Sequence, residues 1–181
     1  DHSDATMLSG ESAMGQYPVE TVATMAHIIA TTESSRFDDV SVGAEILVQS
    51  KLSFVQRRST KLSFNGEVET ALVAAVLART SGAQAIVAGS LTGHTGRLLS
   101  RYRTEVPLLV GSPNLRVVRQ LNLSWGVQPF LMPKVKSTDQ LLRDLLTHAK
   151  HRGLKKGAKL VFVGSEKISP HASSFVGLRT L

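Results

Sequence analysis

The sequence predicts an α/β fold in which a doubly wound, mostly parallel five-stranded sheet is covered by helices on both faces. From about residue 65, short apolar runs alternate with segments whose apolar residues recur every three or four positions. The connections between these segments are short. Because parallel neighbouring strands need crossover connections, the intervening helices fit a parallel sheet.

The expected elements follow from apolar spacing and from the residues that begin and end helices. Gly82 closes the first helix of the sheet region, and Ser137 or Asp139 can cap the last one. In chain order we expect helix 67–80, strand 85–88, a helix carrying Leu98, Leu99 and Tyr102, strand 107–110, a helix beginning at Pro113, strand 127–131, a helix ending near Gly153, strand 160–163 and strand 175–181.

The last strand is expected to run antiparallel to its neighbour. About eleven residues separate Val163 from Phe175, and they include Pro170 and show no helical period. A hairpin return is the shorter connection across such a gap.

The opening of the chain reads as a separate strand and helix. Residues 5–9 are a short apolar run ending at Gly10, which is typical of the end of a buried parallel strand. Pro18 fits the first turn of a helix whose apolar residues follow at spacings of three and four. The polar residues 31–39 then predict a domain boundary, beyond which residues 42–47 are compatible with a short helix.

Composition limits the classes of function. The 181 residues carry 21 Lys and Arg against 14 Asp and Glu, a net charge of +7, which raises the possibility of a phosphate-bearing partner. Aromatic residues make up only 5% and no nucleic-acid-binding motif is present, so nucleic acid is disfavoured. Cysteine is absent, and neither a membrane span nor a signal peptide is evident, so we expect no membrane association and a cytoplasmic location.

The turn Ser-Leu-Thr-Gly-His-Thr, residues 90–95, is a candidate phosphate site. It lies between an expected strand and an expected helix, with hydroxyls at Ser90, Thr92 and Thr95 and with Gly93 allowing close backbone approach. Arg97 could add positive charge. The alternative is an ordinary helix cap and tight turn. Neither a Walker loop nor a dinucleotide fingerprint is present, which favours binding without turnover.

The histidines are weaker candidates. Asp144, His148 and His151 share one helical face at metal-ligand spacing, but their surroundings read better as a solvated, cationic helix end, so we predict no metal site there. His94 and His171 are more readily polar loop residues than catalytic bases, although either could approach a phosphate bound at the turn. Trp125 is more simply explained as a packing or interface residue than as a residue with a chemical role.

Several motifs resemble pyruvate kinases. Residues 4–18, Asp-Ala-Thr-Met-Leu-Ser-Gly-Glu-Ser-Ala-Met-Gly-Gln-Tyr-Pro, are similar to the last catalytic-barrel strand of that family, with Ser12 where threonine is usual. Four later segments occur in the order of the family's C-terminal domain: Thr92-Gly93-His94-Thr95, Arg101-Tyr102-Arg103, Pro107 to Val110, and Trp125 to Pro129. The resemblance implies that residues 1–35 end a (β/α)8 barrel and that residues 36–181 form the C-terminal effector domain.

The resemblance also implies a reaction, phosphoryl transfer from phosphoenolpyruvate to ADP with magnesium and commonly potassium. Ser9 would help hold the water network that protonates the enolate, and Glu11 would support it. The family's phosphoryl-stabilising lysine, metal ligands and substrate-binding arginine belong to earlier barrel strands that this sequence does not contain. The 181-residue chain alone is therefore expected to be inactive and to bind none of these cofactors.

In the resembling family, the turn at residues 90–95 would bind the phosphate of a sugar phosphate such as fructose 1,6-bisphosphate. The family's glycine-rich loop before the final strand is replaced here by residues 166–172, where Lys167 and His171 could contact a second phosphate. The effector's identity is left open. Family members are commonly homotetramers, so self-association is expected. The alternative is a stand-alone regulatory module of the same fold that binds a phosphorylated metabolite without catalysis.

Overall fold

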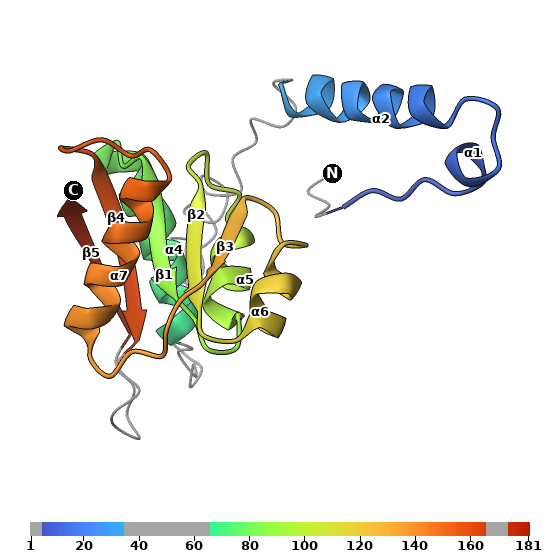
Figure 1. Ribbon diagram of the computed structural model, residues 1–181. Helices are drawn as coiled ribbons and strands as arrows, with labels where there is room; N and C mark the ends of the chain where they lie inside the picture. The colour runs from blue at the N-terminus through green and yellow to red at the C-terminus, as the bar shows by residue number, and fades with distance from the viewer. Residues whose placement is uncertain (1–4, 35–65, 166–173) are drawn as a thin grey trace, which may run out of the picture.

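The computed structural model describes residues 5–34, 66–165 and 174–181 (Figure 1). Its helices and strands follow the predicted alternation from residue 66 onward. The elements are α1 (Gly10–Ala13), α2 (Pro18–Glu33), α4 (Gly66–Ser81), β1 (Ala85–Gly89), α5 (His94–Ser100), β2 (Leu108–Ser112), α6 (Leu115–Leu121), β3 (Val127–Leu131), α7 (Thr138–His151), β4 (Lys159–Ser165) and β5 (Ser174–Thr180).

The five strands form one sheet in the order β3-β2-β1-β4-β5. Strand β1 is central and pairs in parallel with both β2 and β4, with Ile86 opposite Leu108 on one side and opposite Val161 on the other. Strand β5 runs antiparallel to β4, with Val161 opposite Leu178. The predicted mostly parallel, five-stranded sheet and the antiparallel return of the last strand are both confirmed.

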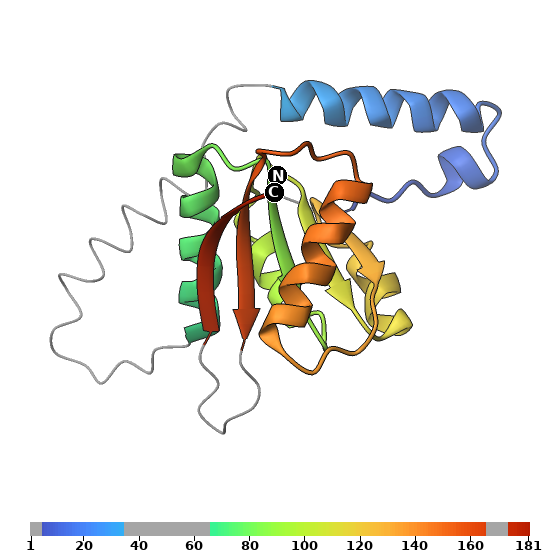
Figure 2. The ribbon, with the colours of Figure 1, turned by 60° about the vertical axis from the view of Figure 1, so that its left-hand side comes forward.

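Helices cover both faces of the sheet and bury two apolar clusters (Figure 2). Side chains of a strand alternate between faces, so Ile86 and Ala88 of β1 pack with α4, α5 and α6, whereas Ala85 and Val87 pack with α7. All four β1 side chains are fully buried. This accounts for the uninterrupted apolar run of a central parallel strand.

Helix α4 approaches the sheet through small residues. Its buried positions are Ala71, Ala74 and Ala78, whereas the larger Leu72 and Val76 are only partly buried. The helix therefore faces the core with its small residues. Alanine presents so little side chain that the helix backbone can lie close to β4 and β5, and α4 contacts both strands.

Two helix boundaries differ slightly from the sequence-based expectation. Helix α6 begins at Leu115 instead of Pro113, because the Asn114 side chain caps it by accepting a hydrogen bond from the backbone N–H of Arg116 at 2.9 Å. Helix α5 ends at Ser100, so Tyr102 lies beyond it and donates its hydroxyl to the carbonyl of Val68 at 3.3 Å. Ser137 caps α7 as expected.

The strand expected at residues 5–9 is not formed. These residues adopt neither helix nor strand, and residues Gly10–Ala13 instead form the single-turn helix α1. A strand requires a neighbour to pair its backbone groups, and no described strand lies beside this segment. Helix α2 begins with Pro18 in its first turn, as predicted. The possible short helix at residues 42–47 lies outside the described residues.

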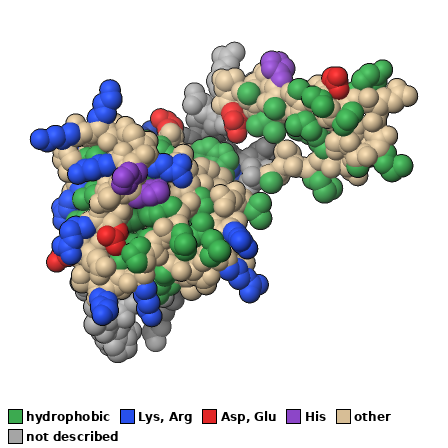
Figure 3. Space-filling view, viewed as in Figure 1, with side chains coloured by type: hydrophobic (Ala, Val, Ile, Leu, Met, Phe, Trp, Pro, Cys, Tyr) green, Lys and Arg blue, Asp and Glu red, His purple; other side chains and the backbone are tan. Residues whose placement is uncertain are grey.

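Helices α1 and α2 pack on each other and lie apart from the sheet (Figure 1). Neither helix buries a residue, and apolar side chains are exposed over this pair (Figure 3). The helices in the described ranges are too short or too polar to cross a lipid bilayer.

Leu121 provides a test of the core on the three-helix face. Its side chain is fully buried, whereas that of Leu123, two residues later, is 72% exposed. We expect Leu121→Ala to lower the free energy of unfolding by about 2–5 kcal/mol because it leaves a cavity, and Leu123→Ala to lower it by less than about 0.5 kcal/mol. Urea unfolding followed by circular dichroism measures both. Equal losses in the two variants would contradict this packing.

Candidate functional site

A cavity of about 450 Å³ opens at the carboxyl ends of β1, β2 and β3. Its walls come from residues 89–92, 94 and 95 at the end of β1 and in the turn after it, Pro113 after β2, residues 132–138 between β3 and α7, Leu141, and Glu67 at the start of α4. Figure 1 shows the connection from β3 to α7 passing beneath the carboxyl ends of the neighbouring strands. Open α/β sheets bind their ligands at this end.

The turn after β1 contributes polar groups to this cavity. Ser90, Thr92, His94 and Thr95 all line it. Their hydroxyl, imidazole and backbone N–H groups include several donors suited to an anionic oxygen. The structure thus brings together four of the five turn residues singled out from the sequence.

Gly93 belongs to the turn but not to the cavity wall. It is buried, has φ +80°, and is not among the residues that line the cavity. A Cβ at this position would lie 2.9 Å from Arg97 Nη1 and 3.1 Å from Val117 Cγ1. The conformation favours glycine, and a side chain here would also force Arg97 and Val117 to shift.

Arg97 places its positive charge beside the turn but outside the cavity wall. Its guanidinium Nη2 donates to the carbonyl of Thr92 at 3.2 Å, and the side chain is not among those lining the cavity. Arg97 therefore braces the turn. The Thr92 hydroxyl also contacts the backbone N–H of His94, at 3.4 Å.

Positive charge comes instead from the connection between β3 and α7. Lys134 and Lys136 line the cavity, followed by Ser137 and Thr138 at the start of α7. Sequence reasoning missed these residues because they lie about forty positions beyond the turn. A usable signal was the Pro-Lys-Val-Lys run directly after an expected parallel strand, where ligand-binding loops occur.

The cavity also has one acidic wall residue. Glu67, in the first turn of α4, places Oε2 3.1 Å from Nε2 of His94. The remaining walls are largely apolar and include Leu91, Met132 and Leu141. The arrangement can hold an anionic group near hydroxyls and lysines and a less polar body against the apolar walls. Lys167 and His171 lie outside the described residues.

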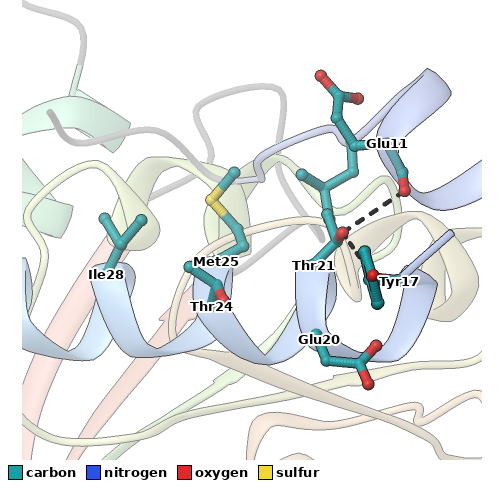
Figure 4. A pocket seen from close by; sticks show the side chains of 8 residues that line it. Glu11, Tyr17, Glu20, Thr21, Thr24, Met25 and Ile28 are labelled. Atoms are coloured by element: carbon teal, nitrogen blue, oxygen red, sulfur yellow. Dashed lines mark hydrogen bonds between the residues drawn. The ribbon is translucent and has the colours of Figure 1, made fainter. Parts of the chain in front are cut away.

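Ser9 and Glu11 belong to a different surface. Glu11 lines an open groove of about 420 Å³ between α1 and α2, together with Tyr17, Thr21 and Met25 (Figure 4). The backbone N–H of Ser9 donates to Glu11 Oε2 at 3.1 Å. Hydrogen bonds from the backbone N–H groups of Glu11 itself and of Ser9 lower the pKa of this exposed carboxyl. No residue lines both this groove and the cavity at the sheet.

One of the two histidines of α7, His148, is used in packing. The ring of His148 stacks on Phe130 with centroids 3.5 Å apart, and its Nε2 accepts a hydrogen bond from Arg152 Nε at 3.3 Å. The cationic helix end is otherwise solvated, since Lys150, His151 and Arg152 are exposed. No group of three or more His, Asp or Glu side chains in the described parts of the chain is arranged to hold a metal ion.

Trp125 also has a packing role. The guanidinium carbon of Arg103 lies 5.1 Å from the centre of the indole ring, and the Ser100 hydroxyl donates to the Trp125 carbonyl at 2.7 Å. These contacts fasten the end of α5 to the turn before β3.

A family model described as the pyruvate kinase alpha/beta domain matches residues 69–175. The chain belongs to the pyruvate kinase family. The match runs from within α4 to the start of β5 and contains every cavity residue except Glu67. The family resemblance seen in the sequence is thereby confirmed.

Curated relatives extend the similarity to most of the chain. The pyruvate kinase of Clostridium acetobutylicum is 36% identical over 165 residues, which are 91% of this chain and 32% of the relative. Pyruvate kinase 2 of Synechocystis is 32% identical over 174 residues, or 96% of this chain and 27% of the relative. The chain thus spans about a third or less of these relatives' length.

A solved structure, Cryptosporidium parvum pyruvate kinase in complex with ADP, has the same fold. It matches with a TM-score of 0.67 and 23% identity over 96% of this chain and 33% of that one. At this identity the likeness supports the fold of the pyruvate kinase α/β domain and carries no ligand to this chain.

His148 predicts a pH dependence of stability. Burial, followed by the charges of Arg152 and His151, lowers the pKa of His148 in the folded protein. The unfolded chain takes up this proton near the ordinary pKa of about 6.5, so the free energy of unfolding should fall as pH drops from about 7 to 5. His148→Phe keeps an aromatic ring beside Phe130 but cannot titrate, and should flatten this dependence in urea unfolding.

His151→Gln is the matched control for that measurement. His151 is exposed in the same last turn of α7, and it contributes least of the three causes to the lowered pKa of His148. The pH dependence should persist in this variant. An unchanged slope in His148→Phe would show that His148 does not cause it.

Proposed function

We propose that the cavity at the sheet binds a phosphorylated effector, with a sugar phosphate as the first candidate. The observation that carries this proposal is the convergence of hydroxyls from the turn after β1 with Lys134 and Lys136 from the loop after β3 around one cavity. Hydroxyl and N–H donors can bond phosphate oxygens, and lysines offset their charge. Two cationic side chains at a distance from the turn suit a ligand with a second anionic group.

We further propose that the chain is the C-terminal part of a complete pyruvate kinase. The curated relatives named pyruvate kinase are about three times its length or more, which supports a parent enzyme that transfers a phosphoryl group from phosphoenolpyruvate to ADP. In that enzyme, residues 1–35 would close the catalytic barrel, and residues 36–181 would form the regulatory domain. Ser9 and Glu11 would then support the proton-donating water network from the barrel end.

No group of three or more acidic or histidine side chains among the described residues is arranged to hold a metal ion. Following the resemblance to the family, we assign magnesium and potassium, with their ligands, to the remainder of the parent enzyme. A cytoplasmic homotetramer is proposed for the parent enzyme. The open side of the edge strand β5, where Leu178 is 39% exposed, supports self-association.

A stand-alone regulatory module is the second candidate. It is favoured by the two apolar clusters that the α/β domain completes without α1 or α2. The intact mass of the native protein separates the two proposals, because a parent enzyme would be several hundred residues longer.

Effector binding can be tested by titration calorimetry. We expect heat from fructose 1,6-bisphosphate, or from another of the probes AMP, sugar monophosphates and inorganic phosphate. Thr95→Val, which removes a cavity hydroxyl, should weaken binding about tenfold, because a hydrogen bond to a charged group contributes roughly 1.5 kcal/mol or more. Thr147→Val, which removes an exposed hydroxyl on α7 outside the cavity, should bind like the parent. An absence of heat from every probe would leave the turn as a structural cap.

Catalysis by the chain itself is the other test. The purified 181-residue protein, supplied with phosphoenolpyruvate, ADP, magnesium and potassium, should form no pyruvate above the background without protein. The Clostridium acetobutylicum relative in the same assay serves as the positive control. Pyruvate formation by a preparation shown by mass to contain no longer polypeptide would overturn the inactivity proposal.

A further inference from the structure

We propose that Glu67 competes with the bound effector for His94. This competition lowers the affinity of the cavity for anions that cannot displace the Glu67 carboxylate. This role rests on the proposed phosphate site. It concerns a residue that lies outside the part matched by the family model, which begins at residue 69. It also assigns a purpose to the one carboxylate that lines a cavity otherwise suited to anions.

The geometry places Glu67 and His94 together at the cavity. Oε2 of Glu67 lies 3.1 Å from Nε2 of His94, and both side chains line the cavity with about half of their surface exposed. Glu67 is the second residue of α4 and His94 is the first of α5, so the pair links the starts of two helices. The contact occupies the Nε2 atom that would otherwise be open to an anion bound at the turn.

Neighbouring charges make this contact important for binding. Arg97, the nearest cation in sequence, donates to the carbonyl of Thr92 and does not line the cavity. Lys134 and Lys136 line it from the loop between β3 and α7. A phosphate held by the turn hydroxyls would therefore share its immediate surroundings with a carboxylate.

Effector binding then becomes an exchange of partners. A phosphate oxygen can accept from His94 Nε2 only if it displaces the Glu67 carboxylate, and any remaining proximity of the two anions opposes binding. Weakly binding anions such as inorganic phosphate would thus be held out of the cavity. A ligand with additional contacts to Lys134 and Lys136 would overcome the competitor.

The substitution Glu67→Gln tests this role in the full 181-residue chain. It removes the competing charge and should tighten binding of fructose 1,6-bisphosphate and of inorganic phosphate about threefold, a size set by the partial exposure of the pair. Glu69→Gln is the matched control, because Glu69 is exposed in the same first turn of α4 but does not line the cavity. It makes the same charge change and should leave both affinities nearly unchanged.

A second set of variants, in which His94 is replaced, distinguishes competition for His94 from electrostatic repulsion between Glu67 and the bound anion. In a His94→Gln protein, Glu67→Gln should improve binding much less than in the wild-type background, because the residue for which Glu67 competes is gone. An equal improvement in both backgrounds would refute competition for His94. Thermal unfolding verifies that each variant is folded before titration.

The remaining outcomes distinguish a failure of the role proposed for Glu67 from a failure of the proposed phosphate site. If the wild-type chain binds a probe and Glu67→Gln binds it equally or less tightly, the competitor role is wrong and the phosphate site stands. If neither the wild type nor Glu67→Gln binds any of the phosphate probes, the proposed phosphate site is wrong and the role of Glu67 falls with it. Binding by Glu67→Gln alone would support both.

Discussion

The central position of β1 is the constraint on which the rest of the α/β domain depends. The chain first builds outward from β1 to β2 and β3, and then returns to place β4 on the opposite side of β1. The return has to cross the sheet, and it carries α7 to the face not occupied by α4, α5 and α6. The loop that begins this crossing runs along the carboxyl ends of the strands, where it faces the turn after β1. The cavity is thus a consequence of strand order.

Sequence patterns predicted the elements well where local signals and tertiary packing agree. Strand β3 occupies the expected residues, Ser137 caps α7, and the short gap after β4 requires the antiparallel return of β5. The expected strand at residues 5–9 was wrong because apolar composition specifies a buried environment but cannot supply the neighbouring strands. An isolated segment has no backbone partners, whatever its composition.

The candidate site was predictable only in its local part. The hydroxyls and the glycine of the turn at residues 90–95 can be recognised within six consecutive residues of the sequence. Lys134, Lys136 and Glu67 enter the same cavity from two other segments, so their participation depends on the strand order and on the crossover of α7. Arg97 shows the reverse case: it is adjacent in sequence, yet its side chain donates to the carbonyl of Thr92 and does not line the cavity.

The energetics of the Glu67–His94 pair limit what it can do. Even a fully charged side-chain pair that is half-exposed contributes only about 0.2–1 kcal/mol, because solvent screens it and the side chains lose freedom. Allosteric coupling between two sites typically requires about 1–3 kcal/mol of differential interaction. Breaking this pair is therefore sufficient to shift the affinity of a ligand severalfold, but it falls short of switching a second site. Any regulatory signal from the cavity would need differential interactions beyond this pair, and α4, which contacts α5, β4 and β5, connects Glu67 to the rest of the domain.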